Sequence, residues 1–111
     1  MALNSICVTS PPSNNECTGA TTLTVNPNNT CSTSTNGSTI GATQSQSGCA
    51  GTADDDVWYS FTATSTAHTI TVTPGTLSDA VLQVFSGSCG SLTSLGCVDN
   101  TSGSSNETIT L

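Results

Sequence analysis

Apolar residues recur at every second position in the middle of this chain. Between positions 57 and 63 every odd-numbered residue is apolar, with Trp58 on the opposite side of the alternation, and Ile70 and Val72 alternate with threonines. Period-two alternation is typical of strands that bury one face. No stretch keeps the spacing of three and four residues that marks an amphipathic helix. The pattern predicts an all-β chain with seven strands, at 21–25, 38–43, 56–63, 68–73, 80–86, 94–99 and 108–111.

Turn-forming residues separate these strands at intervals of roughly ten residues. Asn, Pro, Gly and Ser cluster at 26–29, 74–75, 88–91 and 102–103. Short strands at this spacing predict an antiparallel β-sandwich of the jelly-roll type. The threonines of strand 68–73 are expected to form a ladder on its solvated face.

Residues 1–13 differ in character from the rest. A short apolar piece, Ile6-Cys7-Val8, is followed by Pro11-Pro12 and a polar run, which predicts a strand-like segment and a linker. The sandwich module is therefore expected to span 14–111.

Charge narrows the classes of partner. The 111 residues include no Lys or Arg and seven Asp or Glu, so the net charge is −7. Proteins bind phosphates of nucleic acid mainly through Lys and Arg, so nucleic acid and anionic membranes are excluded as partners. No apolar run approaches the ~18 residues of a membrane span, and we expect no membrane insertion. The seven carboxylates must be solvated, hydrogen-bonded or bound to a metal.

Cysteine usage points to a secreted, extracellular protein. Six cysteines without the C-x-x-C spacing of zinc sites are typical of disulfides in an oxidising compartment. Two pairs of cysteines each enclose little more than one predicted strand or turn, and this proximity in sequence favours a disulfide within each pair. Six cysteines also allow other connectivities. The expected pairs are Cys17 with Cys31, Cys89 with Cys97 and, by elimination, Cys7 with Cys49 or with another chain.

Three adjacent carboxylates precede the strand of Trp58. Because the chain has no cation to offset them, a calcium ion with oxygen ligands would relieve their repulsion. The alternative is a solvated acidic turn, and the spacing differs from that of an EF-hand loop. The expected metal ligands are Asp54, Asp55, Asp56 and Asp99, with Asn100 or Glu16 as further candidates.

The inventory of side chains argues against an enzyme. His68 is the one histidine, it lies at the start of a predicted strand, and no G-x-S-x-G motif accompanies it. Paired carboxylates can hydrolyse glycosides, but the chain has few aromatic residues to hold a sugar. We interpret His68 as structural and the chain as non-catalytic.

Four Asn-x-Ser/Thr sequons and the threonine ladders are candidate sites for N-linked and O-linked sugars. In a chain with 18 Ser and 22 Thr, several sequons arise by chance. The sequon asparagines are Asn28, Asn36, Asn100 and Asn106.

Three blocks of sequence, at 15–20, 56–62 and 79–100, occur in a recognisable order. Their sequences are NECTGA, DVWYSFT and a run from DAVLQVFSGSCGSL to CVDN. Together they resemble the pre-peptidase C-terminal-like β-sandwich modules of large secreted and cell-surface bacterial proteins. The resemblance covers about 14–111, and it implies a non-catalytic, jelly-roll-like module of a class that sometimes binds calcium or polysaccharide.

In that family further strands follow the one that matches 108–111, whereas this sequence stops there. A sandwich without its last strand would have an open edge, unless the chain is simply truncated. One hypothesis is therefore a surface-fibre or tandem-repeat subunit in which residues 2–9 of one copy complete the sheet of the next. The alternative is a carbohydrate-binding accessory module of a secreted enzyme, with Trp58 as the stacking platform. A third hypothesis is an ancillary domain trimmed from a secreted peptidase.

Overall fold

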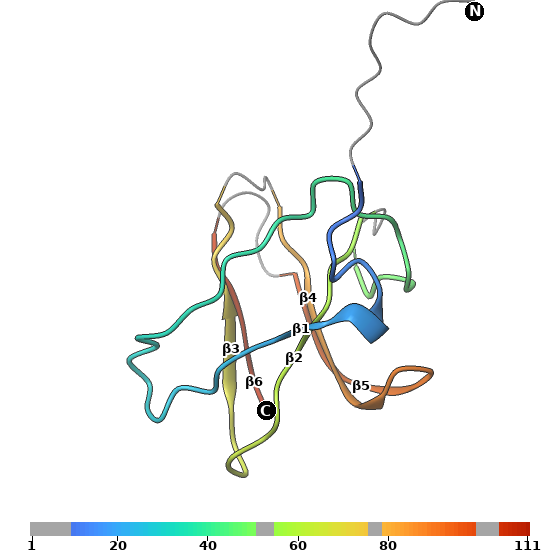
Figure 1. Ribbon diagram of the computed structural model, residues 1–111. Coiled ribbons are helices and arrows are strands. Elements are labelled where there is room, and N and C mark those ends of the chain that lie inside the picture. Colours follow the sequence, from blue (N-terminus) through green and yellow to red (C-terminus); the bar gives the residue numbers. More distant parts are fainter. Residues whose placement is uncertain (1–9, 51–54, 76–78, 100–104) are drawn as a thin grey trace, which may run out of the picture. The chain divides into compact units, whose positions relative to one another are not determined.

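The computed structural model describes residues 10–50, 55–75, 79–99 and 105–111 (Figure 1). Within these ranges the chain forms six strands and a short 3-10 helix, η1 (Cys17–Gly19). The strands are β1 (Thr21–Thr22), β2 (Tyr59–Ser60), β3 (Thr69–Val72), β4 (Leu82–Ser88), β5 (Ser91–Val98) and β6 (Glu107–Thr110). No helix in the described part of the chain is long and apolar enough to cross a membrane. The all-β prediction is confirmed.

The described residues form two compact units. The first comprises 10–45 and 55–61, and the second comprises 46–50, 62–75, 79–99 and 105–111. Residues 2–9, which carry the predicted strand exchange, lie outside the described ranges.

In the first unit, β1 and β2 pair in parallel, with Thr21 opposite Tyr59. The predicted strand 38–43 is absent, and this prediction is wrong. The Ser38 hydroxyl accepts the backbone N–H of Ile40 (3.1 Å), and Gly41 has a φ of 78°. A serine that captures nearby backbone and a glycine in the left-handed region produce a turn in place of an extended segment.

In the second unit, β4 and β5 form an antiparallel hairpin whose register shifts between Val84 and Phe85. The turn lies at Cys89 and Gly90, inside the predicted turn 88–91. Gly90 has a φ of 90°, which suits glycine because it has no Cβ. This hairpin is the orange pair of strands in Figure 1.

The second pair of strands in this unit is β3 with β6, also antiparallel. Ile70 stands opposite Ile109, and both are half-buried, while the flanking threonines are exposed. The hydroxyls of Thr71 and Thr108 are hydrogen-bonded across the strands at 3.1 Å. The predicted threonine ladder and the predicted faces of this strand are therefore confirmed.

The two antiparallel ribbons pack together as in a β-sandwich. β6 contacts both β4 and β5, and the Ile109 side chain lies so close to Gly96 that a Cβ there would overlap it. Pro74, Ala80 and Val84 are the buried apolar residues of the described chain. Glu107 is fully buried, and no buried side-chain N or O atom of the described residues lacks a hydrogen-bond partner.

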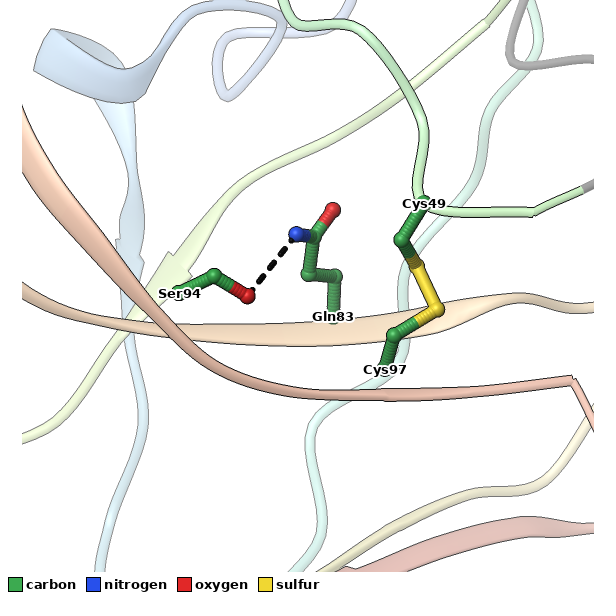
Figure 2. Close-up of a disulfide and its surroundings, with 4 residues drawn as sticks. All are labelled: Cys49, Gln83, Ser94 and Cys97. Atoms are coloured by element: carbon green, nitrogen blue, oxygen red, sulfur yellow. Dashed lines mark hydrogen bonds between the residues drawn. A yellow bond between two sulfur atoms is a disulfide. The ribbon is translucent and has the colours of Figure 1, made fainter.

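The disulfides differ from those expected. Cys49 is bonded to Cys97 of β5, with the two Cα atoms 6.1 Å apart (Figure 2). Cys17 and Cys89 each take part in a disulfide, whereas Cys31 is an exposed free thiol. The predicted pairs Cys17 with Cys31, Cys89 with Cys97 and Cys7 with Cys49 are therefore wrong, and Cys7 itself lies outside the described residues.

The reason is geometric. Cys89 lies in the turn and Cys97 lies near the far end of β5, opposite Gln83. A hairpin of this length separates two cysteines that sequence proximity alone would pair, because each strand residue adds about 3.3 Å. Next to the disulfide, the Gln83 side-chain amide donates a hydrogen bond to the Ser94 hydroxyl at 3.1 Å (Figure 2).

Candidate functional site

Trp58, in the first unit, is hydrogen-bonded through both of its backbone groups. Its backbone N–H donates to the Asn14 carbonyl (2.9 Å), and its carbonyl accepts from the Thr21 N–H (3.0 Å). The Asn14 side-chain amide donates to the same Trp58 carbonyl at 3.0 Å. Asn14, which is only 7% exposed, thus bonds both backbone groups of Trp58, and its side-chain amide shares the Trp58 carbonyl with the Thr21 N–H.

The indole is held separately from the backbone. Its Nε1–H donates to the Ser45 hydroxyl at 2.8 Å, and that hydroxyl donates to Asp56 Oδ1 at 2.7 Å. The Ser45 backbone N–H donates to Asp56 Oδ2 at 3.1 Å. All three residues are half-buried. We call this chain from Trp58 through Ser45 to Asp56 the indole relay.

A second pair of hydrogen bonds fixes the loop that carries Ser45. Asn15 Oδ1 accepts the backbone N–H of Thr43 at 2.7 Å, and Asn15 Nδ2 donates to the Thr43 hydroxyl at 2.9 Å. The same amide lies 3.3 Å from Glu16 Oε1. Hydrogen bonds thus join 14–16 to 43–45, the two segments whose Asn14 and Ser45 bind Trp58, and each bond of this kind contributes on the order of 1 kcal/mol.

In the described residues, the arrangement around Trp58 consists of groups that can stack or form hydrogen bonds. It offers an oriented indole, hydroxyl and amide groups, and carboxylates that only accept hydrogen bonds. His68 belongs to the second unit, where its Nε2 accepts the Thr64 N–H at 3.2 Å and its backbone pairs with Leu111. These contacts close a turn, and the structural role of His68 stays a prediction.

The predicted metal ligands are only partly described. Asp54 and Asn100 lie outside the described residues, Asp55 is exposed, and Asp99 is exposed in the second unit. Asp56 accepts two hydrogen bonds from Ser45. In the described ranges no three His, Cys, Asp or Glu residues gather as a metal site, so calcium stays a prediction.

The sequon asparagines are described at three of four positions. Asn28, Asn36 and Asn106 are exposed, and Asn100 lies outside the described ranges. Asn28 Oδ1 accepts the Thr30 backbone N–H at 3.0 Å, which ties the first sequon into a local turn. Their glycosylation stays a prediction.

Comparison with protein families identifies the family of the chain. The profile of the galactose-binding-domain-like family associated with the type IX secretion system matches residues 13–110. The chain belongs to this family. No curated protein and no solved structure matches it.

Membership in the galactose-binding-domain-like family supports a secreted bacterial surface protein with a β-sandwich fold, as the sequence predicted. It does not support the pre-peptidase C-terminal-like family specifically, so that likeness stays a resemblance of motifs. Domains of the galactose-binding-like type are typically non-catalytic modules, and the family favours the carbohydrate-binding alternative over the fibre hypothesis.

The residues that the sequence did not reveal are those that hold Trp58 in this galactose-binding-domain-like chain. Asn14, Asn15 and Ser45 lie in polar stretches where Asn and Ser are frequent, and neither spacing nor pattern distinguishes them. One general signal was present. A polar segment that lies beside a strand, and has no apolar side chains to pack, must bind the strand through backbone or side-chain amide groups. This signal was too general to single out Asn14.

Proposed function

We propose that this domain is a non-catalytic carbohydrate-binding module of a secreted bacterial protein, in which a sugar stacks on the Trp58 indole. The observation that carries the proposal is how Trp58 is held. Its backbone N–H and carbonyl are both hydrogen-bonded and its indole N–H is bonded to Ser45, yet the residue stays partly exposed. An aromatic side chain fixed in this way offers an apolar face at little entropic cost on binding.

The chemistry around the indole suits a sugar. A sugar ring presents C–H groups on its face and hydroxyls at its rim, so it needs an aromatic surface bordered by hydrogen-bonding groups. Asn15, Glu16 and Thr43 provide amide, carboxylate and hydroxyl groups in the segments that hold Trp58. An apolar surface with a few oriented polar groups is the usual composition of small-ligand sites.

The module would attach a secreted protein to glycans rather than act on them. Its family is associated with secretion and described as galactose-binding-domain-like, and this supports galactose as the first sugar to test. The resemblance to pre-peptidase C-terminal-like modules, some of which bind polysaccharide, points the same way. The fibre hypothesis rests on residues 2–9, outside the described ranges, and no comparison supports it.

The test is binding of the purified domain to a glycan array and to galactose by calorimetry. We expect Trp58→Ala to abolish binding, because the stacking surface is lost, and Trp58→Phe to retain part of it. Leu95→Ala is the matched control, since Leu95 is 49% exposed and belongs to the second unit. Binding that survives Trp58→Ala unchanged would contradict the proposal, as would filaments formed by a domain that binds no glycan.

A further inference from the structure

The indole relay fixes a negative charge close to the proposed stacking surface. Two hydrogen bonds, of 2.8 and 2.7 Å, link Trp58 Nε1 to Asp56 Oδ1 through the Ser45 hydroxyl. Asp56 Oδ1 therefore lies less than about 6 Å from the indole nitrogen, within the range of a direct Coulomb interaction.

The hydrogen-bond directions in the indole relay run from the indole toward Asp56. An indole nitrogen only donates, so the Ser45 hydroxyl accepts from Trp58 and directs its own proton to Asp56. The other Asp56 oxygen accepts the Ser45 backbone N–H. Both Asp56 oxygens therefore accept hydrogen bonds from Ser45.

Nothing in the chain offsets this charge with a Lys or Arg, because the sequence contains neither. Two further acidic residues accompany it in the same unit. Glu16 lies beside Asn15, and the exposed Asp55 precedes Asp56. A ligand stacked on Trp58 therefore lies close to the Asp56 carboxyl group, and no Lys or Arg of the chain offsets its charge.

We propose that the site selects uncharged sugars and that the Asp56 carboxylate makes it reject anionic ones such as uronates; this inference rests on the proposed carbohydrate-binding function. A ligand carboxylate about 7 Å from Asp56 would be repelled by a factor of about 3 at the dielectric constant of water. The factor rises to about 50 at the lower effective dielectric constant of a protein surface.

The test compares matched pairs of sugars that differ only in a carboxylate. Methyl galactoside and methyl galacturonide form the first pair, and glucose and mannose with their uronates complete the set. Binding is measured in EDTA, at low and high salt, and the readout is the ratio of the two affinities within each pair. We expect the wild-type domain to bind the neutral member at least about 3-fold more tightly at low salt, and less selectively at high salt.

Asp56→Asn removes the charge but keeps the shape of the side chain, and its amide can donate to the Ser45 hydroxyl. We expect this variant to lower the affinity ratio toward one. Asp79→Asn removes an equal charge from an exposed residue of the second unit and should leave the ratio unchanged.

Equal or tighter binding of the uronate by the wild-type domain would overturn this inference alone, and so would an affinity ratio that Asp56→Asn does not change. Failure to bind any sugar of either kind would overturn the proposed function and the inference together. The two failures are therefore distinguishable in one experiment.

Discussion

The Cys49–Cys97 disulfide gives the sharpest test of the second unit. It closes a loop with a sequence separation of 48 residues. In the chain-entropy model a loop of this length stabilises the folded state by about 4 kcal/mol, whereas a Cys89–Cys97 bond across the hairpin would contribute about 2.5 kcal/mol. For a chain of 111 residues, a loss of 4 kcal/mol corresponds to a fall in Tm of about 15 °C.

The perturbation is the double substitution Cys49→Ala/Cys97→Ala, followed by thermal and urea denaturation monitored by far-UV circular dichroism. Each single variant should be nearly as unstable as the double variant, because either change breaks the same bond. Cys31→Ser is the matched control, since Cys31 is an exposed free thiol, and its effect should stay within about 0.5 kcal/mol.

Disulfide mapping by mass spectrometry completes the assay and needs a protease other than trypsin, because the chain has no Lys or Arg. Two results would refute the reasoning. One is a double variant that melts within about 2 °C of the wild-type domain, where about 15 °C is expected. The other is a peptide that joins Cys97 to any cysteine except Cys49.

Three further predictions concern the relay, the packing of β6 and calcium. Ser45→Ala should cost about 1–3 kcal/mol and should red-shift the emission of Trp58, the one tryptophan, whereas Ser45→Thr keeps the hydroxyl and the spectrum; identical spectra for both variants would contradict the relay. Gly96→Ala should destabilise by about 1–2 kcal/mol because the added Cβ overlaps Ile109, and Ile109→Val should recover most of this loss in urea denaturation. If calcium binds at 54–56, calcium chloride should raise the Tm and EDTA should reverse the rise; a calorimetric titration without heat would rule the site out.

The parts of the fold that the sequence predicted well are those governed by alternation. Ile70 and Val72 alternate with threonines, and both the strand and its faces were found as expected. The hairpin turn at Gly90 was also predictable, because glycine and serine cluster there. These features are local, so the residues that specify them are neighbours in the chain.

The failures have the opposite origin. Strand 38–43 was predicted from β-branched residues, but the Ser38 side chain and Gly41 turn the backbone instead. The disulfide from Cys49 to Cys97 spans 48 residues, and proximity in sequence favours shorter pairs. The partners that hold Trp58, Asn14 and Ser45, are 44 and 13 residues away, so no local pattern singles them out.

The absence of Lys and Arg also explains why the site has the character proposed for it. An ion pair with Lys or Arg both satisfies the hydrogen bonds of a carboxylate and offsets its charge. Asp56 is ordered instead by the hydroxyl and backbone N–H of Ser45, which satisfy the oxygens but leave the charge in place. Ser and Thr, 40 residues together, can supply such neutral donors throughout the chain. A domain built in this way keeps the field of its carboxylates at the surface, so it repels anionic ligands and leaves recognition to stacking and to hydroxyl contacts.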